Sequence, residues 1–194
     1  MIKVGITASM GSGKTFIVKC FSDLGISTFI MDEVVKMIYA TSLDFKNKLS
    51  TVFPQFIKDD KIDKKTIASY IFNHPEDLKI LSGIINPFLN SELQSFYYKN
   101  RRKKFVIVET ALLFEYKLEN TFDKIILVVP SFDAKVVAMK RDSITEEEYN
   151  KRMSSQIDIK EKIKKSHYII NNDFTPNVKK DVYLVYKDLF VRFL

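Results

Sequence analysis

The chain has 194 residues, a formal net charge of +7 and one cysteine, Cys20. This length suffices for one globular domain or for one core with inserted subdomains, and a lone cysteine excludes an internal disulfide and a cysteine-rich metal site. No apolar run approaches the ~20 residues that span a bilayer, and residues 1–8 do not read as a secretory leader. We therefore expect a cytoplasmic protein without a membrane partner.

The positive charge favours anionic partners, which include nucleic acids and phosphorylated small molecules. The lysines are spread along the chain, and the one dense basic cluster, residues 101–104, is expected to be a solvated helix end. No interleaving of aromatic and basic residues typical of a nucleic-acid-binding sheet is present, so we expect no nucleic-acid partner.

The first element is an apolar strand that runs into a small-residue loop, in the segment 4–15, V-G-I-T-A-S-M-G-S-G-K-T. In such a loop, backbone N–H groups, a helix N-terminus and Lys14 converge on nucleotide phosphates, and the Thr15 hydroxyl coordinates Mg²⁺. The first glycine of the pattern G-x-x-x-x-G-K-[ST] is replaced by Ala8, so the loop must begin with a negative φ there or carry strain. The predicted nucleotide-binding residues are Ser9, Met10, Gly11, Ser12, Gly13, Lys14, Thr15 and Phe16.

Asp32 follows the second expected strand, residues 27–30, and precedes a helix expected at about 33–39. Ligands of parallel sheets bind outside the carboxyl ends of the strands, so this carboxylate is expected to face the nucleotide site. It would accept the proton of an attacking hydroxyl or orient that hydroxyl for attack on the γ-phosphorus. The alternative is an N-cap of the following helix, and the sequence leaves both roles open.

Residues 42–102 have a helical pattern, interrupted by loops near 54–61 and 73–75 and without a continuous β-run. This block breaks the alternation of strands and helices. In a nucleotide-binding sheet, such an insertion commonly holds the second substrate.

Two apolar strands are expected at 105–109 and 124–129, and Glu109 ends the first. A carboxylate at this position reaches Mg²⁺ through water or orients the acceptor, whereas the alternative is a hydrogen bond to a neighbouring loop. Buried strand ends seldom hold an unpaired glutamate, which favours the functional role. Glu115, after an apolar stretch, fits a surface residue.

A helix expected at 133–141 ends in Arg141, and Thr145 with Glu148 forms a capping box for a second, polar helix. Arginines on a flap over a transferring phosphoryl group supply charge and exclude water. Arg141 is the stronger candidate for this role, because Arg152 is equally explained by a surface pair with Glu148.

The chain ends with a strand expected at 168–170 and a helix that begins at Pro176. Strands that alternate with helices predict an α/β fold with a parallel sheet covered on both faces. The residues expected to be buried by the last helix are Val178, Val182, Val185 and Leu189.

Taken in order, these motifs resemble those of the dephospho-coenzyme A kinase family, whose loop reads T-G-G-I-G-S-G-K-S. The segment that ends I-M-D-E-V-V-K resembles G-x-x-V-I-D-A-D-x-x-A-R, and its second aspartate falls on Asp32. Because the resemblance is collinear along nearly the whole chain, it is far more specific than one phosphate loop. Further matches are K-I-D-K at 61–64, I-F at 71–72, Asn86 with Pro87 in place of His-Pro, E-T-A-L-L-F-E at 109–115 in place of D-x-P-L-L-F-E, Arg141 with Asp142, the lid segment 146–156, and Y-I-I-N-N at 168–172.

The resemblance implies a P-loop three-layer sandwich with a five-stranded parallel sheet, a helical coenzyme A-binding domain and a lid. It implies transfer of the γ-phosphate of ATP to the 3′-hydroxyl of dephospho-coenzyme A by a monomer or a small homo-oligomer. The implied core comprises 1–32, 104–141 and 166–194, with the helical domain at 33–103 and the lid at 142–165. The implied roles are catalysis by Asp32, Lys14 and Arg141, nucleotide contacts from Arg152 and Asn172, substrate contacts from Asp32, Asn86, Leu113 and Phe114, and Mg²⁺ at Thr15 and Glu109.

The chain departs from the family pattern in ways that bear on efficiency more than on the reaction. Ile30 replaces the first aspartate of D-A-D, so Asp32 carries any work that two carboxylates would share, and Val137 stands where the family has an arginine. Two alternatives therefore stay open: a kinase for another small acceptor, such as a nucleoside, and a nucleotide-binding module without catalysis. The other departures are Ala8, Asn86, Glu109, Ala111 and Phe174.

Overall fold

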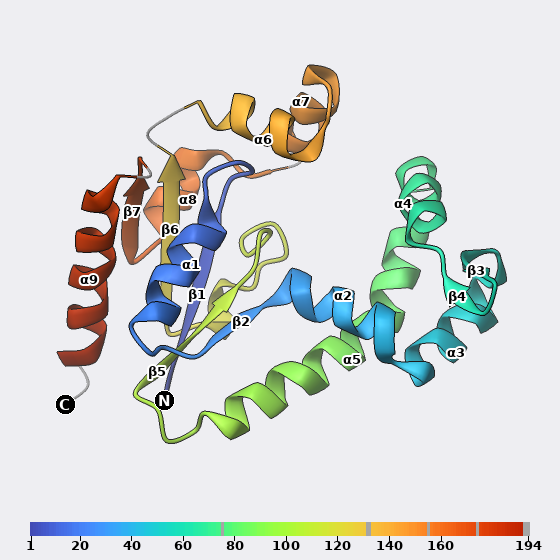
Figure 1. The fold of residues 1–194 in the computed structure, drawn as a ribbon, viewed down its shortest axis with the longest axis horizontal. Helices are drawn as coiled ribbons and strands as arrows, with labels where there is room; N and C mark the ends of the chain where they lie inside the picture. The colour runs from blue at the N-terminus through green and yellow to red at the C-terminus, as the bar shows by residue number, and fades with distance from the viewer. Residues whose placement is uncertain (75, 131–132, 155, 174, 192–194) are drawn as a thin grey trace. The chain divides into compact units, whose positions relative to one another are not determined.

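The computed structural model describes residues 1–74, 76–130, 133–154, 156–173 and 175–191 (Figure 1). Phe174, one of the departures from the family pattern, lies outside these ranges. The chain forms two compact units, Met1–Phe29 with Asn100–Leu194, and Ile30–Lys99. Among the described residues, no helix combines the length and the apolar character needed to cross a membrane.

The first unit is built on a five-stranded sheet in the order β2-β5-β1-β6-β7. β1 pairs in parallel with β5 and β6, and β6 pairs in parallel with β7. The central strands are apolar throughout, and all five residues of β5 are buried, as expected for a sheet covered on both faces. The strands are β1 (Ile2–Ala8), β2 (Thr28–Ile30), β5 (Phe105–Glu109), β6 (Lys124–Pro130) and β7 (Tyr168–Asn172).

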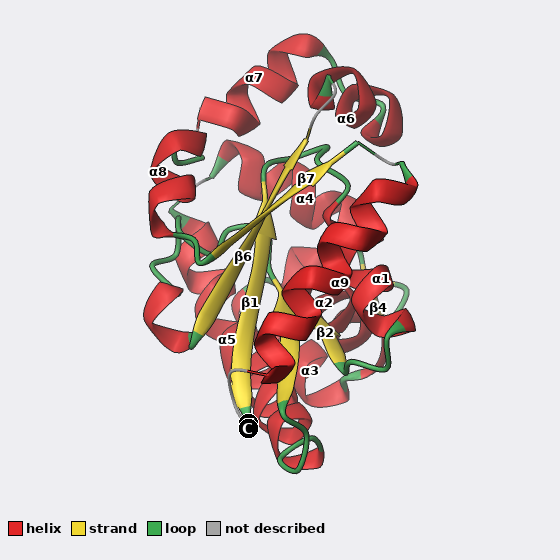
Figure 2. Cartoon of the chain, turned by 90° about the vertical axis from the view of Figure 1, so that its left-hand side faces the viewer, coloured by secondary structure: helices red, strands yellow, loops and turns green. Residues whose placement is uncertain are grey.

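Helices cover both faces of this sheet, which confirms the predicted three-layer α/β architecture. Figure 2 shows α1 and α9 on one side of the sheet and α8 on the other. In α9, Val178, Val182 and Leu189 are buried as predicted, whereas Val185 is only half-buried. The helices are α1 (Lys14–Asp23), α6 (Ala134–Asp142), α7 (Glu146–Ser154), α8 (Ile159–Lys165), α9 (Pro176–Val191) and the 3₁₀ turn η2 (Glu119–Thr121).

The second unit is helical and has its own apolar core. Phe45, Leu49 and Phe56 are fully buried, and residues of α2, α4 and α5 pack around them. Two side chains cap helix N-termini. Ser42 accepts a hydrogen bond from Phe45 N at the start of α3, and Asp63 accepts hydrogen bonds from the N–H groups of Lys65 and Thr66 at the start of α4. The elements are α2 (Met31–Thr41), α3 (Leu43–Val52), the 3₁₀ turn η1 (Pro54–Phe56), β3 (Ile57–Lys58), β4 (Lys61–Ile62), α4 (Lys64–Asn73) and α5 (Asp77–Lys99).

The expectation that this unit lacks β-structure is wrong in one place. β3 and β4 form an antiparallel hairpin with two residues per strand. Asp59 and Asp60 turn the chain with φ of 49° and 59°. Aspartate tolerates the left-handed region, which the favoured two-residue hairpin turn requires at both central positions.

Candidate active site

The loop between β1 and α1 has the backbone of a phosphate-binding loop. Gly11 and Gly13 have φ of 81° and 75°, and α1 begins at Lys14, directly after Gly13. Glycine adopts this left-handed conformation without steric cost, and the helix N-terminus presents N–H groups to an anion. Ala8 ends β1, pairs with Val128 and is not among the described residues of positive φ. The loop therefore begins without strain at the substituted glycine.

One hydrogen bond from β7 and one within the loop hold the loop in place. The Asn172 Nδ2 atom donates to the Ser12 carbonyl at 2.8 Å, and Asn172 is fully buried. The Ser12 hydroxyl donates to the Ser9 carbonyl at 2.7 Å. The sequence points to Asn172 as a nucleotide contact, but its observed bond supports the loop backbone, so a direct contact with nucleotide stays a prediction.

Lys14 forms an ion pair with Glu109, which is 3% exposed at the end of β5. A buried carboxylate needs such a partner, because an unpaired charge in the interior is costly. The pair places the lysine ammonium, the carboxylate and the start of α1 together. Thr15, the next residue of α1, is exposed.

Thr15 and Glu109 offer the hard oxygen ligands that Mg²⁺ prefers. The described residues contain no group of three or more His, Cys, Asp or Glu that could hold a metal ion alone. This donor set fits Mg²⁺, which typically takes one or two protein ligands and completes its shell with water and substrate phosphates.

Asp32 is the second residue of α2 and is exposed. The helix begins two residues earlier than predicted, and its N-cap position is occupied by Ile30, which makes no side-chain cap bond. The capping role considered for Asp32 is therefore wrong. Asp32 and Glu33 both lie in the first turn of α2, where a negative charge interacts favourably with the helix dipole.

The predicted substrate residues lie in different environments. Asn86 is exposed on α5, directly before Pro87. Leu113 and Phe114 are buried in the first unit, and an added Cβ at Gly5 would lie 2.7 Å from Leu113 Cδ1. Core packing accounts for these two side chains, and their contact with substrate stays a prediction.

The predicted lid arginines are on α6 and α7. The Arg141 guanidinium bonds Asp142 through Nε and Nη2 at 2.7 and 2.8 Å, and it lowers the pKa of that carboxyl. Arg152 is exposed on α7. The capping box is confirmed, since Thr145 N donates to Glu148 Oε2 at 2.8 Å and Glu148 N donates to Thr145 Oγ1 at 3.2 Å.

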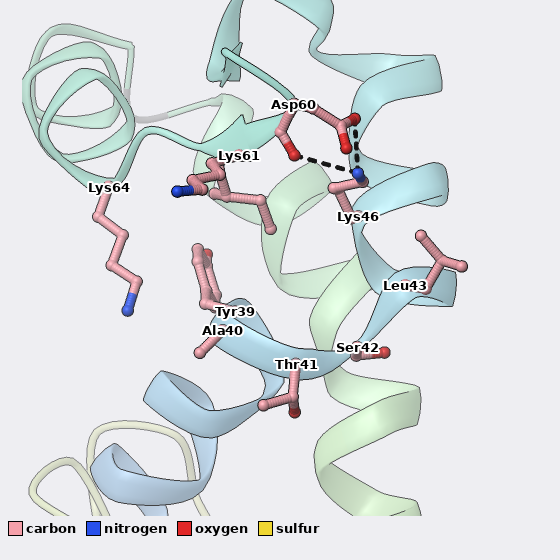
Figure 3. A pocket seen from close by; sticks show the side chains of 10 residues that line it. Tyr39, Ala40, Thr41, Ser42, Leu43, Lys46, Asp60, Lys61 and Lys64 are labelled. Carbon is pink, nitrogen blue, oxygen red and sulfur yellow. Dashed lines mark hydrogen bonds and ion pairs between the residues drawn. The ribbon is translucent and has the colours of Figure 1, made fainter.

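A pocket of about 370 Å³ in the helical unit was not predicted (Figure 3). It lies between the end of α2, the start of α3, the hairpin and the start of α4. Lys46 bonds Asp60 at 2.7 Å, whereas no ion pair joins Lys61 or Lys64 to a carboxylate among the described residues. With Tyr39 beside them, these two amines make the pocket suited to an anion with an apolar or aromatic part. No local pattern predicts the pocket, because its lining comes from four separate elements, although Lys61 and Lys64 belong to the K-I-D-K segment that resembles the family pattern.

Solved structures share this fold. A protein of Thermus thermophilus superposes with a TM-score of 0.82 at 23% identity, over 100% of this chain and 98% of its own. A dephospho-CoA kinase of Campylobacter jejuni has a TM-score of 0.69 at 27% identity, over 96% of both chains.

Sequence comparisons identify the family. The chain is 28% identical to a dephospho-CoA kinase of Bacillus cereus over 179 residues, which are 90% of each protein. It is 32% identical to one of Rhizobium meliloti over 175 residues, which are 88% of this chain and 89% of the relative. The family model for dephospho-CoA kinase matches residues 2–177, so the phosphate loop, the whole helical unit, α7 and α8 lie inside the match, whereas most of α9 lies beyond it, and the chain belongs to the dephospho-CoA kinase family.

Proposed function

We propose that this protein transfers the γ-phosphate of ATP to the 3′-hydroxyl of dephospho-coenzyme A and releases coenzyme A and ADP. The family match over residues 2–177 carries this proposal. The left-handed glycines of the phosphate loop support its nucleotide half. The expected location of such a metabolic kinase is the cytoplasm, and nucleic acid has no part in the reaction.

In this reaction the loop N–H groups and Lys14 bind the β- and γ-phosphates. Thr15 and Glu109 would hold Mg²⁺ together with water and phosphate oxygens, and the bound metal would neutralise charge on the phosphoryl oxygens. The acceptor O3′ forms a bond to the γ-phosphorus as the bond from that phosphorus to the β,γ-bridging oxygen breaks. The electron pair leaves with ADP, and Asp32 accepts the hydroxyl proton. Arg141 and Arg152 would stabilise the transferring charge.

Dephospho-coenzyme A carries a diphosphate, and the pocket of Figure 3 supports a role for the helical unit in holding it. Lys61 and Lys64 supply two positive charges at the pocket, and Tyr39 adds an aromatic surface. Point charges of this kind are common phosphate partners. On this proposal Asn86 hydrogen-bonds the acceptor elsewhere on the same unit.

The role of Asp32 is tested by Asp32→Asn in an assay of ATP consumption with dephospho-coenzyme A. General-base catalysis contributes about 10²–10⁴-fold, so we expect kcat to fall by about 100-fold or more. Glu33→Gln, the neighbouring acid on α2, is the matched control and should retain activity. A kcat for Asp32→Asn within a few-fold of wild type would remove the base from the mechanism.

The pocket is tested by the double variant Lys61→Ala/Lys64→Ala. If these amines bind the acceptor equally in the ground and transition states, KM for dephospho-coenzyme A rises about tenfold while KM for ATP and kcat stay unchanged. Lys79→Ala, an exposed lysine of α5 outside the pocket, serves as the control. An unchanged acceptor KM in the double variant would exclude the pocket from acceptor binding.

A further inference from the structure

Lys162 is a lysine with no solvent exposure, and it is not part of the proposed chemistry. Its Nζ atom lies 2.8 Å from Glu115 Oε1, and the Glu115 side chain is 10% exposed. Glu115 follows β5, whereas Lys162 belongs to α8. The sequence treats Glu115 as a surface residue, and the structure corrects this: it forms a buried ion pair between segments far apart in the chain.

The same carboxylate also fixes the backbone before α8. Glu115 Oε1 accepts a hydrogen bond from Ile157 N at 3.0 Å, and Lys162 Nζ donates to Gln156 Oε1 at 3.4 Å. A second ion pair, Glu119 with Lys165 at 3.4 Å, joins the same two segments one helical turn further on. α8 itself packs on β6 (Figure 2). The chain from residue 156 onward is therefore attached to the sheet.

α7, immediately before this point, has a different attachment. It packs on α6, and Glu146 at its start pairs with Lys135 of α6. The last turn of α7 carries Arg152, four residues before Gln156. Gln156 N donates to the carbonyl of Met153 at 3.0 Å, and Met153 adjoins Arg152 on α7, so the fixed position of Gln156 limits where the Arg152 guanidinium can reach.

We propose that Glu115 is a positioning residue that fixes the C-terminal base of the lid. On this proposal the moving part of the lid ends before Gln156, α8 stays with the sheet, and the anchor directs Arg152 toward the transferring phosphoryl group. The effect of the anchor on catalysis rests on the proposed phosphoryl transfer, whereas the position of the hinge does not.

The ion pair of Glu115 with Lys162 is costly to bury, which indicates that it positions the lid and does not mainly stabilise the fold. Glu115 Oε2 is buried without a hydrogen-bond partner in the described structure. Buried ion pairs are often no more stabilising than apolar side chains of the same volume, because both charges lose their hydration. Two directed contacts on one carboxylate oxygen nevertheless hold the backbone at Ile157 in one position.

Hydrogen exchange of the wild-type protein, with and without Mg·ADP, tests the location of the hinge. We expect amides of α7 to gain protection on binding, whereas amides of α8 are already protected and change less than twofold. This experiment needs no acceptor, so it gives an answer whichever hydroxyl the enzyme phosphorylates. If α8 changes as much as α7, the whole segment moves and the anchor proposal is overturned.

The variant Glu115→Leu/Lys162→Met tests the consequence for catalysis. It removes both charges and the acceptor for Ile157 N but keeps the volume filled, so we expect a melting temperature close to wild type. We expect kcat to fall about tenfold, and the ATP hydrolysed per acceptor phosphorylated to rise about threefold, because a misplaced lid admits water. Both KM values should stay within about twofold.

The matched control is Glu161→Leu/Lys164→Met, the exposed ion pair on the same helix. This control variant should leave kcat and the amount of ATP hydrolysed per acceptor phosphorylated unchanged. A Glu115→Leu/Lys162→Met enzyme with wild-type kcat and coupling would show that the pair is only structural. If that variant does not fold, the hydrogen-exchange result decides whether the anchor proposal holds. Absence of turnover in the wild-type protein would count against the proposed function alone.

Discussion

Lys14 and Glu109 form an ion pair at the position where nucleotide phosphates are expected. Phosphate oxygens attract the same ammonium group, so nucleotide binding would exchange one anionic partner of Lys14 for another. The carboxylate left behind is 3% exposed and needs a new cation. We propose that Mg²⁺ would supply that cation, which would couple metal binding to nucleotide binding through Glu109.

This coupling predicts opposite effects of Glu109→Gln with and without Mg²⁺. Without the metal, the variant should bind ATP several-fold more tightly, because Lys14 no longer has to leave a carboxylate. With Mg²⁺, kcat should fall by about tenfold or more, because the metal has lost a charged ligand. Titration calorimetry in EDTA and in Mg²⁺, combined with steady-state kinetics, measures both effects.

Glu109→Asp is the matched control for this prediction, since it keeps the charge and restores the residue of the family pattern. It should retain Mg²⁺-dependent turnover within a few-fold. Equal ATP affinity of wild type and Glu109→Gln in EDTA would show that the ion pair does not oppose nucleotide binding.

Single-residue roles could be predicted from the sequence only where they depend on local chain geometry. The left-handed Gly11 and Gly13 and the start of α1 follow from a short motif, and they are confirmed. The bond from Asn172 to Ser12 joins residues 160 apart, and the pair of Glu115 with Lys162 depends on the docking of α8. Such contacts need the sheet order, which no local pattern specifies.

Helices and strands, like single residues, could be predicted where local sequence determines them. The capping box at Thr145 and the Pro176 helix start follow from spacing alone, and both are observed. The hairpin at 57–62 was missed because two-residue strands are too short for an alternating pattern, and its Asp-Asp turn lacks the usual glycine. The sequence predicts the start of α2 two residues late, because Met31 continues an apolar run that is typical of a strand and Asp32 is typical of its end.

The start of β7 contains a pH-sensitive contact. Ile125 N donates to His167 Nδ1 at 3.2 Å, so the imidazole must be neutral at that nitrogen. Burial, with a smaller contribution from Lys124, lowers the pKa of His167 in the folded state. Its contribution to stability is therefore complete above the unfolded pKa of about 6.5 and is lost as the pH falls through the lower folded value.

His167→Asn should remove this part of the pH dependence, because an amide oxygen accepts the Ile125 bond and does not titrate. We expect wild type and variant to have similar melting temperatures at pH 7.5, and the variant to lose less on acidification to pH 5. Thermal unfolding monitored by circular dichroism at both pH values makes the comparison. A parallel loss in the two proteins would assign the acid sensitivity to other groups.

At the scale of the whole molecule, the chain leaves the sheet after β2 and returns to it at β5, the neighbour of β2. Residues 30–99 therefore form an insertion between adjacent strands, and they carry a separate core. The break in strand–helix alternation is the feature of the sequence that predicts an insertion at this place. The identity of the acceptor, by contrast, rests on the family and not on the insertion pattern.

Ligand-dependent thermal unfolding tests the acceptor on the intact protein. A ligand at about 100 times its Kd stabilises the folded state by about 2.7 kcal/mol. For a chain of this size that energy raises Tm by about 5–10 °C. We expect dephospho-coenzyme A to give such a shift, and ADP with dephospho-coenzyme A to give a larger one because two sites are filled. Adenosine and shikimate are the control acceptors, and a shift with either that exceeds the shift with dephospho-coenzyme A would indicate a kinase for another hydroxyl.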